Sequence, residues 1–401
     1  MNVLILINKV PYPPKDGGAI ATFNLIRSYV ELGHRVTVLA MNTDKHRVEL
    51  DAFPQSVRDM AKWMLVDVPA KITFIAALRN LFFSNLPYNA ERFIVENYHE
   101  QLKEVLTAEK FDVVQLEGLY VCPYIPLIRK LSGALIAYRS HNIESEIWER
   151  KLVQSTGIEF TYLKVLQQRL ARFEQSFVDR YDILVPITER DGRRWDEWGN
   201  SKPQCVCPTG LNVGEYETSE VSNADLFHLG ALDWAPNQEG LLWFLENCWA
   251  KVLALQPQVK LHIAGRNCPL WLEKEFQKYE GLVYHGEVDD ARDFMNKYGI
   301  MIVPLLSGSG MRIKIIEGLA LKKAIVSTPV GAEGIDVVDG IHIQIAEKED
   351  GFVHKVVNLV QNHMQLIELG ENGRKFVELE YDNLSITKRL AGFLQNHLSD
   401  K

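Results

Sequence analysis

The first forty residues, MNVLILINKVPYPPKDGGAIATFNLIRSYVELGHRVTVLA (1–40), hold two apolar runs on either side of a helical pattern. Residues 3–7 and 35–40 are short and mainly apolar, which predicts two buried strands. Between them, residues 23–33 repeat apolar positions at helical spacing and end at Gly33, a residue type that commonly terminates helices. A strand, a helix and a second strand in this order predict parallel strands, and therefore an α/β sheet covered by helices.

The same alternation continues through the rest of the chain. In the first half we predict a long helical stretch over 145–177 and further strands at 72–74, 112–116, 134–138 and 183–187. In the second half we predict strands at 226–229, 260–264, 282–285, 300–303 and 324–327. The polar stretch EWGNSKP (197–203) separates the two series. We therefore expect two doubly wound Rossmann-like domains, 1–198 and 199–380, facing a central cleft, and an amphipathic helix within 381–401.

The overall composition narrows the class of protein. A chain of 401 residues is longer than one hydrophobic core usually serves, and its net charge of −8 argues against a general nucleic-acid binder. The five cysteines lack the spacing of a disulfide framework or a zinc site, which predicts thiols in a reducing compartment. Because no run reaches the roughly 18 apolar residues of a membrane span and no signal peptide is visible, we expect a cytoplasmic protein.

The stretch PLLSGSGMRIKIIEG (304–318) combines a glycine-rich turn with cations at the start of a helix. Arg312 and Lys314 would lie at the helix end that carries partial positive charge, so we expect an anion beside them. The N–H groups of the turn would hold a diphosphate, and Glu317, on the same helix face as Lys314, would accept hydrogen bonds from a ribose. The alternative is a solvated first turn with a Lys314–Glu317 ion pair.

Other phosphate-binding motifs fit this stretch less well. A Walker A loop needs Gly-Lys-Ser/Thr, whereas Gly310 is followed by Met-Arg, and a dinucleotide fingerprint would need a third glycine where Ile313 stands. Asp44 could imitate the ribose-binding acid of an NAD site, but the fingerprint that should accompany it is missing. A second glycine pair, Gly17-Gly18, precedes the first helix of the chain.

The segment GSGMRIKIIE (308–317) resembles the signature of a subgroup of the family-four (group 1) retaining glycosyltransferases, which have the GT-B fold. That family usually carries an E-x7-E pattern whose second Glu binds the nucleotide ribose. Glu317 matches the second position, whereas Ser309 stands at the first. The family's usual Arg and Lys pair after the first strand of this domain is missing, because GALDWAPNQEG (230–240) has Asp233, Trp234 and Asn237 there. We expect Lys314 and Arg312 to replace that pair beside the departing diphosphate. The resemblance also implies donor binding by Ser309, Gly310, Met311 and Arg312.

Weaker resemblances extend over nearly the whole chain. YRSHNIES (138–145) places His141 where the family has an active-site histidine, and its imidazole could donate a hydrogen bond to the sugar or the diphosphate. The resemblance further implies that Gly17 and Gly18 lie near the donor phosphates and that the family's terminal helix packs back on the first domain. In the same way, Arg266 would reach a phosphate and the backbone of HGEVDD at Val288 would contact the base. The alternatives are a structural histidine and a surface ion pair of Arg266.

We therefore expect a retaining glycosyltransferase that takes a nucleotide diphosphate sugar as donor and a hydroxyl of a surface glycan or its lipid-linked precursor as acceptor. No D-x-D motif occurs, so we expect neither a metal nor another cofactor. The apolar and basic stretch 72–93 could contact the inner membrane surface, although a core helix with exposed Arg79 and Arg92 is favoured. The alternative functions are a sugar-nucleotide epimerase of GT-B architecture and a non-catalytic nucleotide-sugar sensor.

Overall fold

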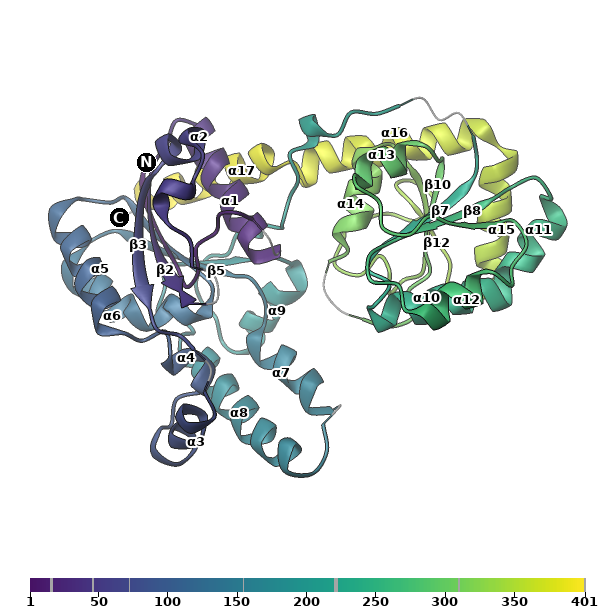
Figure 1. Ribbon diagram of the computed structural model, residues 1–401. Helices are drawn as coiled ribbons and strands as arrows, with labels where there is room; N and C mark the ends of the chain where they lie inside the picture. Colours follow the sequence, from purple (N-terminus) through teal and green to yellow (C-terminus); the bar gives the residue numbers. More distant parts are fainter. Residues whose placement is uncertain are drawn as a thin grey trace. The chain divides into compact units, whose positions relative to one another are not determined.

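The computed structural model describes residues 1–14, 17–44, 47–71, 73–153, 155–219, 223–308 and 311–399 (Figure 1). The chain forms two compact units: one contains Met1–Gly210 and Asn383–Lys401, and the other contains Leu211–Asp382. Each unit is built on a six-stranded parallel sheet, so each is a Rossmann-like domain. Among the described helices, none has both the length and the apolar character that a membrane crossing requires.

The sheet of the first unit has the strand order β3-β2-β1-β4-β5-β6. Its strands are β1 (Asn2–Ile7), β2 (Arg35–Thr43), β3 (Lys62–Val68), β4 (Val113–Glu117), β5 (Leu135–Ser140) and β6 (Ile183–Pro186). Its helices are α1 (Gly17–Glu31), α2 (Gln55–Met60), α3 (Phe74–Phe83), α4 (Tyr88–Glu91), α5 (Glu96–Ala108), α6 (Ile125–Leu131), α7 (Glu144–Val153), α8 (Gly157–Gln175), α9 (Glu189–Glu197) and α17 (Asn383–Ser399).

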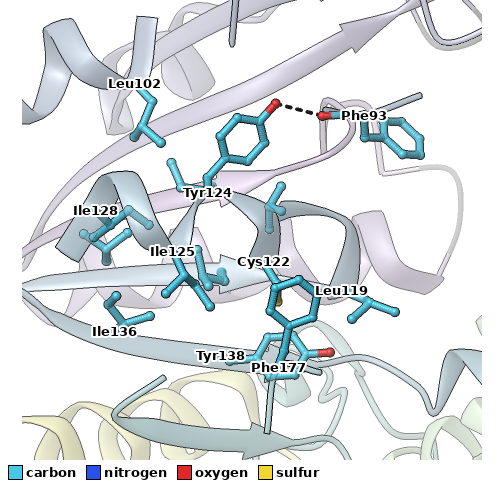
Figure 2. Close-up of a cluster of buried hydrophobic side chains, with 14 of the residues drawn as sticks. Phe93, Leu102, Leu119, Cys122, Tyr124, Ile125, Ile128, Ile136, Tyr138 and Phe177 are labelled. Carbon is cyan, nitrogen blue, oxygen red and sulfur yellow. Dashed lines mark hydrogen bonds between the residues drawn. The ribbon is translucent and has the colours of Figure 1, made fainter. Parts of the chain in front are cut away.

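Alternate residues of β1 supply the two cores of this unit, because successive side chains of a strand point to opposite faces. Leu4 and Leu6 belong to one core, and Val3, Ile5 and Ile7 belong to the other. Figure 2 shows part of the first core, where the hydroxyl of buried Tyr124 donates to the carbonyl of Phe93 at 2.8 Å. Burial on both faces explains why these strands have mainly apolar sequences rather than a regular apolar–polar alternation.

Helix α17 packs on the first unit, where Ile386, Leu390 and Leu394 enter the same core as residues of α1 (Figure 1). The units divide between Gly210 and Leu211, whereas we expected the division at residue 198. The difference arises because the segment after α9 continues the edge of the first sheet. The N–H of Leu184 donates to the carbonyl of Pro203, the N–H of Cys205 donates back to Leu184, and Cys207 is buried in the core.

The predicted strand at 72–74 is wrong. Ile72 lies outside the described residues, and Phe74 is the first residue of helix α3. Thr73 caps that helix, since its side chain accepts a hydrogen bond from the N–H of Ala76 at 3.2 Å. The strand of this region is β3, and the predicted helical stretch 145–177 is divided into α7 and α8.

The second unit has the strand order β12-β11-β10-β7-β8-β9. Its strands are β7 (Leu226–Leu229), β8 (Leu261–Ala264), β9 (Leu282–Tyr284), β10 (Ile300–Val303), β11 (Ala324–Ser327) and β12 (Gln344–Ile345). Its helices are α10 (Ala235–Phe244), α11 (Ala250–Leu255), α12 (Leu270–Phe276), α13 (Ala291–Asn296), α14 (Ile313–Ala320), α15 (Glu349–Gln361) and α16 (His363–Glu380). The order of this sheet brings the loops after β7, β8 and β10 together at its carboxyl edge.

Candidate active site

A pocket of about 510 Å³ opens at the carboxyl ends of β7, β8 and β10 in the second unit. Its lining consists of Gly230, Ala231, Asp233, Trp234, Asn237, Arg266, Met311, Arg312, Ile313 and Lys314. Ligands of open α/β sheets bind at this edge. Three of the lining side chains are cations and only one is an acid, so the pocket suits an anionic ligand.

Two glycines bring the loops after β7 and β8 into close backbone contact. A Cβ atom on Gly265 would lie 1.8 Å from the carbonyl oxygen of Gly230, so only glycine fits there. A Cβ on Gly230 would lie 2.8 Å from Nδ2 of Asn237 and 3.3 Å from Nζ of Lys314. The missing side chain at position 230 therefore leaves the space in which Asn237 and Lys314 meet.

Lys314 lies in the first turn of α14, and its Nζ donates to Oδ1 of Asn237 at 3.0 Å. Burial, followed by the nearby positive charge of Arg312, lowers the pKa of Lys314 to about 7. A bound anion would oppose both effects and favour the charged ammonium. Because Lys314 pairs with Asn237, and no Lys314–Glu317 ion pair occurs in the described part of the chain, the alternative of a simple Lys–Glu pair does not hold.

Arg312 directly precedes α14 and is buried, with 6% of its surface exposed. Its guanidinium carbon lies 5.3 Å from the ring centroid of Trp234, within the range of a cation–π contact. A Cβ on Gly308 would lie 2.8 Å from Nη2 of Arg312 and 3.1 Å from the Trp234 ring, and Gly308 has a φ of 114°. Glycine is needed at position 308 because of its positive φ and because a side chain would collide with Arg312 and Trp234. Burial lowers the pKa of Arg312.

Glu317 lies one turn further along α14 and accepts a hydrogen bond from the hydroxyl of Tyr216 at 3.1 Å. Burial raises the pKa of the Glu317 carboxyl, while the Tyr216 hydrogen bond and the charge of Arg292 oppose that rise. Glu317 does not line the pocket described above. It could still reach a ligand from the neighbouring turn of the helix, because residues three apart share a helix face.

The other expected donor-site residues fall into three groups. Arg266 and Met311 line the pocket, and exposed Arg266 forms no ion pair with any residue that the structure describes. Val288 follows β9 and packs half-buried against a core of the second unit, outside the pocket lining. Ser309 and Gly310 lie outside the described residues.

The glycine pair and the histidine lie in the first unit, at the carboxyl edge of its sheet. Gly17 and Gly18 begin α1, the first helix after β1 in the chain. His141 follows the last residue of β5, and its side chain is 15% exposed. The structure therefore places the three expected residues at the ends of strands β1 and β5.

His141 is part of a buried polar cluster around Glu117, the last residue of β4. Oε2 of Glu117 lies 2.8 Å from Nε2 of His141, 3.3 Å from Nη1 of Arg139 and 2.8 Å from Oγ1 of Thr22. Burial alone would raise the pKa of Glu117, but Arg139 and then His141 outweigh it and lower that pKa to about 2. Glu117 is therefore an ionised carboxylate with almost no exposure to water.

Sequence reasoning missed Glu117, Arg139 and Tyr216. The available signal for Glu117 was a carboxylate at the end of the otherwise apolar strand sequence VVQLE. A buried charge is costly unless it is paired, so this position pointed to a partner on a neighbouring strand. The partner itself could be named only once β4 and β5 were known to be adjacent.

Residues 223–362 match the family described as Glycosyl transferases group 1. Over 96% of its length, the chain is 22% identical to a 44.6 kDa protein of the cps region of Klebsiella pneumoniae, of which it covers 97%. Its fold resembles sucrose-phosphate synthase from Thermosynechococcus elongatus (TM-score 0.68, 14% identity, all of both chains). It also resembles HepE from Anabaena in complex with UDP (TM-score 0.65, 12% identity, 99% of this chain and all of that chain).

These comparisons agree with the geometry of the second unit. The matched region contains β7 to β11, helix α14 and every residue that lines the pocket. The match to the group 1 glycosyltransferase family thus lies within the second unit. The whole chain, with its two Rossmann-like domains, has the GT-B fold.

Proposed function

We propose that the protein is a retaining glycosyltransferase that moves a sugar from a nucleotide diphosphate sugar to a hydroxyl acceptor. The observation that carries this proposal is that Lys314 lines an anion-suited pocket, where burial and Arg312 lower its pKa to about 7. A negatively charged ligand would stabilise the charged form of such a buried lysine. The departing diphosphate of a sugar nucleotide carries such charge and gathers more in the transition state.

Different residues of the second unit would bind the diphosphate, the ribose and the base of the donor. Lys314, Arg312 and Arg266 would neutralise the diphosphate, together with the N–H groups at the start of α14 and those of Ser309 and Gly310. Glu317 would accept hydrogen bonds from the ribose, and the backbone at Val288 would contact the base. Because protein cations supply the charge, the proposal requires neither a metal nor another cofactor.

The first unit would act on the transferred sugar and on the acceptor. We assign His141 to a contact with the sugar, and the Gly17-Gly18 turn to a contact with the donor phosphates. The departing phosphate would take the proton of the acceptor hydroxyl, so no second carboxylate is needed as a base. The cps-region relative supports a surface glycan, or its lipid-linked precursor, as the acceptor class.

A contact with the inner membrane surface forms part of the proposal, through helix α3. The favoured core interpretation of stretch 72–93 does not hold at the end of this helix, where Phe82 and Phe83 are 71% and 86% exposed. Arg79 on the same helix is exposed, whereas Arg92 is half-buried and donates to the carbonyl of Ala70. Two aromatic side chains beside a cation suit an anionic bilayer. The double variant F82S/F83S should lose sedimentation with anionic vesicles, and equal sedimentation would contradict the contact.

Calorimetric titration with UDP, GDP, ADP and their sugars tests the donor proposal directly. We expect at least one of these nucleotides to bind with the same affinity in buffer and in excess chelator. The variant K314A should bind it more weakly, whereas K322A, at the opposite end of α14, should bind it as the wild type does. Failure of every nucleotide to bind would contradict the proposal.

A further inference from the structure

The hydrogen bond between His141 and Glu117 restricts what His141 can offer to a ligand. An ionised carboxylate can only accept hydrogen bonds, and Glu117 is ionised because Arg139 is paired with it. The proton in the 2.8 Å contact must therefore be carried by Nε2 of His141. In a neutral imidazole one nitrogen is a donor and the other is an acceptor, so Nδ1 then carries a lone pair.

The remaining ring nitrogen is the one that can meet a ligand. Nδ1 of His141 has no hydrogen-bond partner among the residues that the structure describes. The side chain lies directly after β5, at the sheet edge where ligands of such folds bind, and is partly exposed. In this tautomer, Nδ1 of His141 is a hydrogen-bond acceptor at this edge of the sheet.

The Glu117 carboxylate has further partners besides His141. Glu117 and Arg139 are buried and cancel each other's charge, with 0% and 2% of their side-chain surfaces exposed. Thr22 of α1 and Gln115 of β4 also donate to the Glu117 carboxylate.

We infer that Glu117 is a positioning residue, which fixes the Nε2–H tautomer of His141 so that Nδ1 accepts a hydrogen bond from a hydroxyl of the bound sugar or acceptor. This inference rests on the proposed function for the identity of the ligand, but the tautomer itself is a property of the free protein. It reverses the direction of the hydrogen bond expected from the sequence, where His141 was a donor. No proton needs to leave the hydroxyl in this role.

The tautomer can be measured without any substrate. The full chain is labelled with ¹⁵N in its histidine rings, and the ring signals of His141 are identified by their loss in H141N. In the neutral ring we expect the proton on Nε2 and none on Nδ1. A proton on Nδ1, or protons on both nitrogens, would overturn the inference whether or not the chain transfers sugar.

The positioning role of Glu117 is tested by E117Q. An amide can either donate to Nε2 or accept from it, so the ring is no longer held in one tautomer, and signals of an Nδ1–H form should appear. Turnover should fall roughly 10–100-fold, the range typical of a metal-binding histidine that loses the group orienting its ring. Nucleotide affinity should stay unchanged. If E117Q does not fold because Arg139 loses its partner, the double variant E117Q/R139Q is used. An unchanged tautomer with unchanged turnover would contradict the role.

Two substitutions of His141 show which of the two ring nitrogens contacts the ligand. The amide of glutamine reaches the position of Nε2, whereas the amide of asparagine reaches that of Nδ1. If Nδ1 meets the ligand, H141N should retain about tenfold more turnover than H141Q. Higher turnover in H141Q would show that the ligand meets Nε2 and would overturn the inference. Nucleotide binding in both variants is the control, because its loss would point to a failure of the proposed donor site.

Discussion

Lys314 and Asn237 meet beside a glycine: Nζ donates to Oδ1 at 3.0 Å, and the space next to both atoms exists because residue 230 has no side chain. Asn237 thus holds the ammonium at the carboxyl ends of β7 and β10 without supplying a negative charge. A neutral partner leaves the charge of Lys314 available to a ligand. In this respect Lys314 differs from a lysine held in a structural ion pair.

The first prediction concerns pH. Because burial and Arg312 lower the pKa of Lys314 to about 7, the free protein loses this charge above pH 7, and nucleotide affinity should fall from pH 7 to 9. Binding at pH 8 should take up a proton, which calorimetry in two buffers of different ionisation enthalpy detects. The uptake should be absent in K314A. If K314A takes up the same proton, the titrating group lies elsewhere.

The same pKa predicts the opposite trend for folding. Between pH 7 and the usual lysine pKa of about 10.4, an unfolded Lys314 binds a proton that the folded protein does not. Stability rises with pH wherever the unfolded state binds more protons, so this residue should raise the free energy of unfolding across that window. Urea titrations of the wild type and K314A measure the difference. A contribution of Lys314 that falls with pH would contradict the assigned shift.

The second prediction concerns Gly230. A methyl group at this position would press on the ends of two flexible side chains, so G230A should fold but displace Lys314 and Asn237. We expect about tenfold weaker nucleotide binding, or about 1.4 kcal/mol, from the loss of one charged contact. The matched control is G214A, since a Cβ at Gly214 meets no atom within 4 Å. Equal affinity of both variants would show that the space beside Lys314 is not used.

The third prediction separates two roles of Glu317. If its carboxylate binds the ribose, E317A should weaken nucleotide binding by about 1.5–3 kcal/mol, as for a hydrogen bond to a charged group. The control is Y216F, which removes the hydroxyl bound to Glu317 but keeps the carboxylate. Nucleotide titrations of both variants decide the matter. An equal loss of affinity in Y216F would mean that Glu317 acts only by holding Tyr216.

The fourth prediction concerns the stability of the segment that follows His141. Buried Glu174 accepts hydrogen bonds from the N–H of Glu144 at 2.8 Å and from the N–H and hydroxyl of Ser145 at 3.0 and 2.7 Å. E174A would leave these donors at the start of α7 unpaired, so the free energy of unfolding should fall by about 2–4 kcal/mol. E149A, at an exposed position of α7, is the control and should change it little. Equal urea midpoints would contradict the capping role.

Local patterns predicted most of the fold because strands buried on both faces have mainly apolar sequences. The predicted strands 226–229, 300–303 and 324–327 have the bounds that the structure gives to β7, β10 and β11. The strand at 72–74 was wrong because a short apolar run also suits an amphipathic helix, and Thr73 caps one here. The domain boundary was misplaced because edge pairing by residues 203–207 leaves no compositional signal.

The candidate site could be predicted from the sequence only where the signal lies within one short segment. The cations of the 304–318 stretch conflict with the helix dipole, and this local conflict pointed to a ligand. Asn237, Tyr216 and Glu117 act through contacts 77, 101 and 24 residues away in sequence. Such contacts depend on strand order, which one sequence does not reveal. The contact between Glu117 and His141 in particular follows from the adjacency of β4 and β5.

The most direct test of the central claim is the fate of a sugar nucleotide in the absence of any acceptor. The donor that binds in calorimetry is incubated with the protein in excess chelator, and NMR follows its anomeric proton. We predict slow release of the nucleoside diphosphate, with a free sugar that first appears in the same anomeric form as the donor. Conversion to an epimeric sugar nucleotide, complete stability of the donor, or release only after Mg²⁺ or Mn²⁺ is added would contradict a metal-independent retaining transferase.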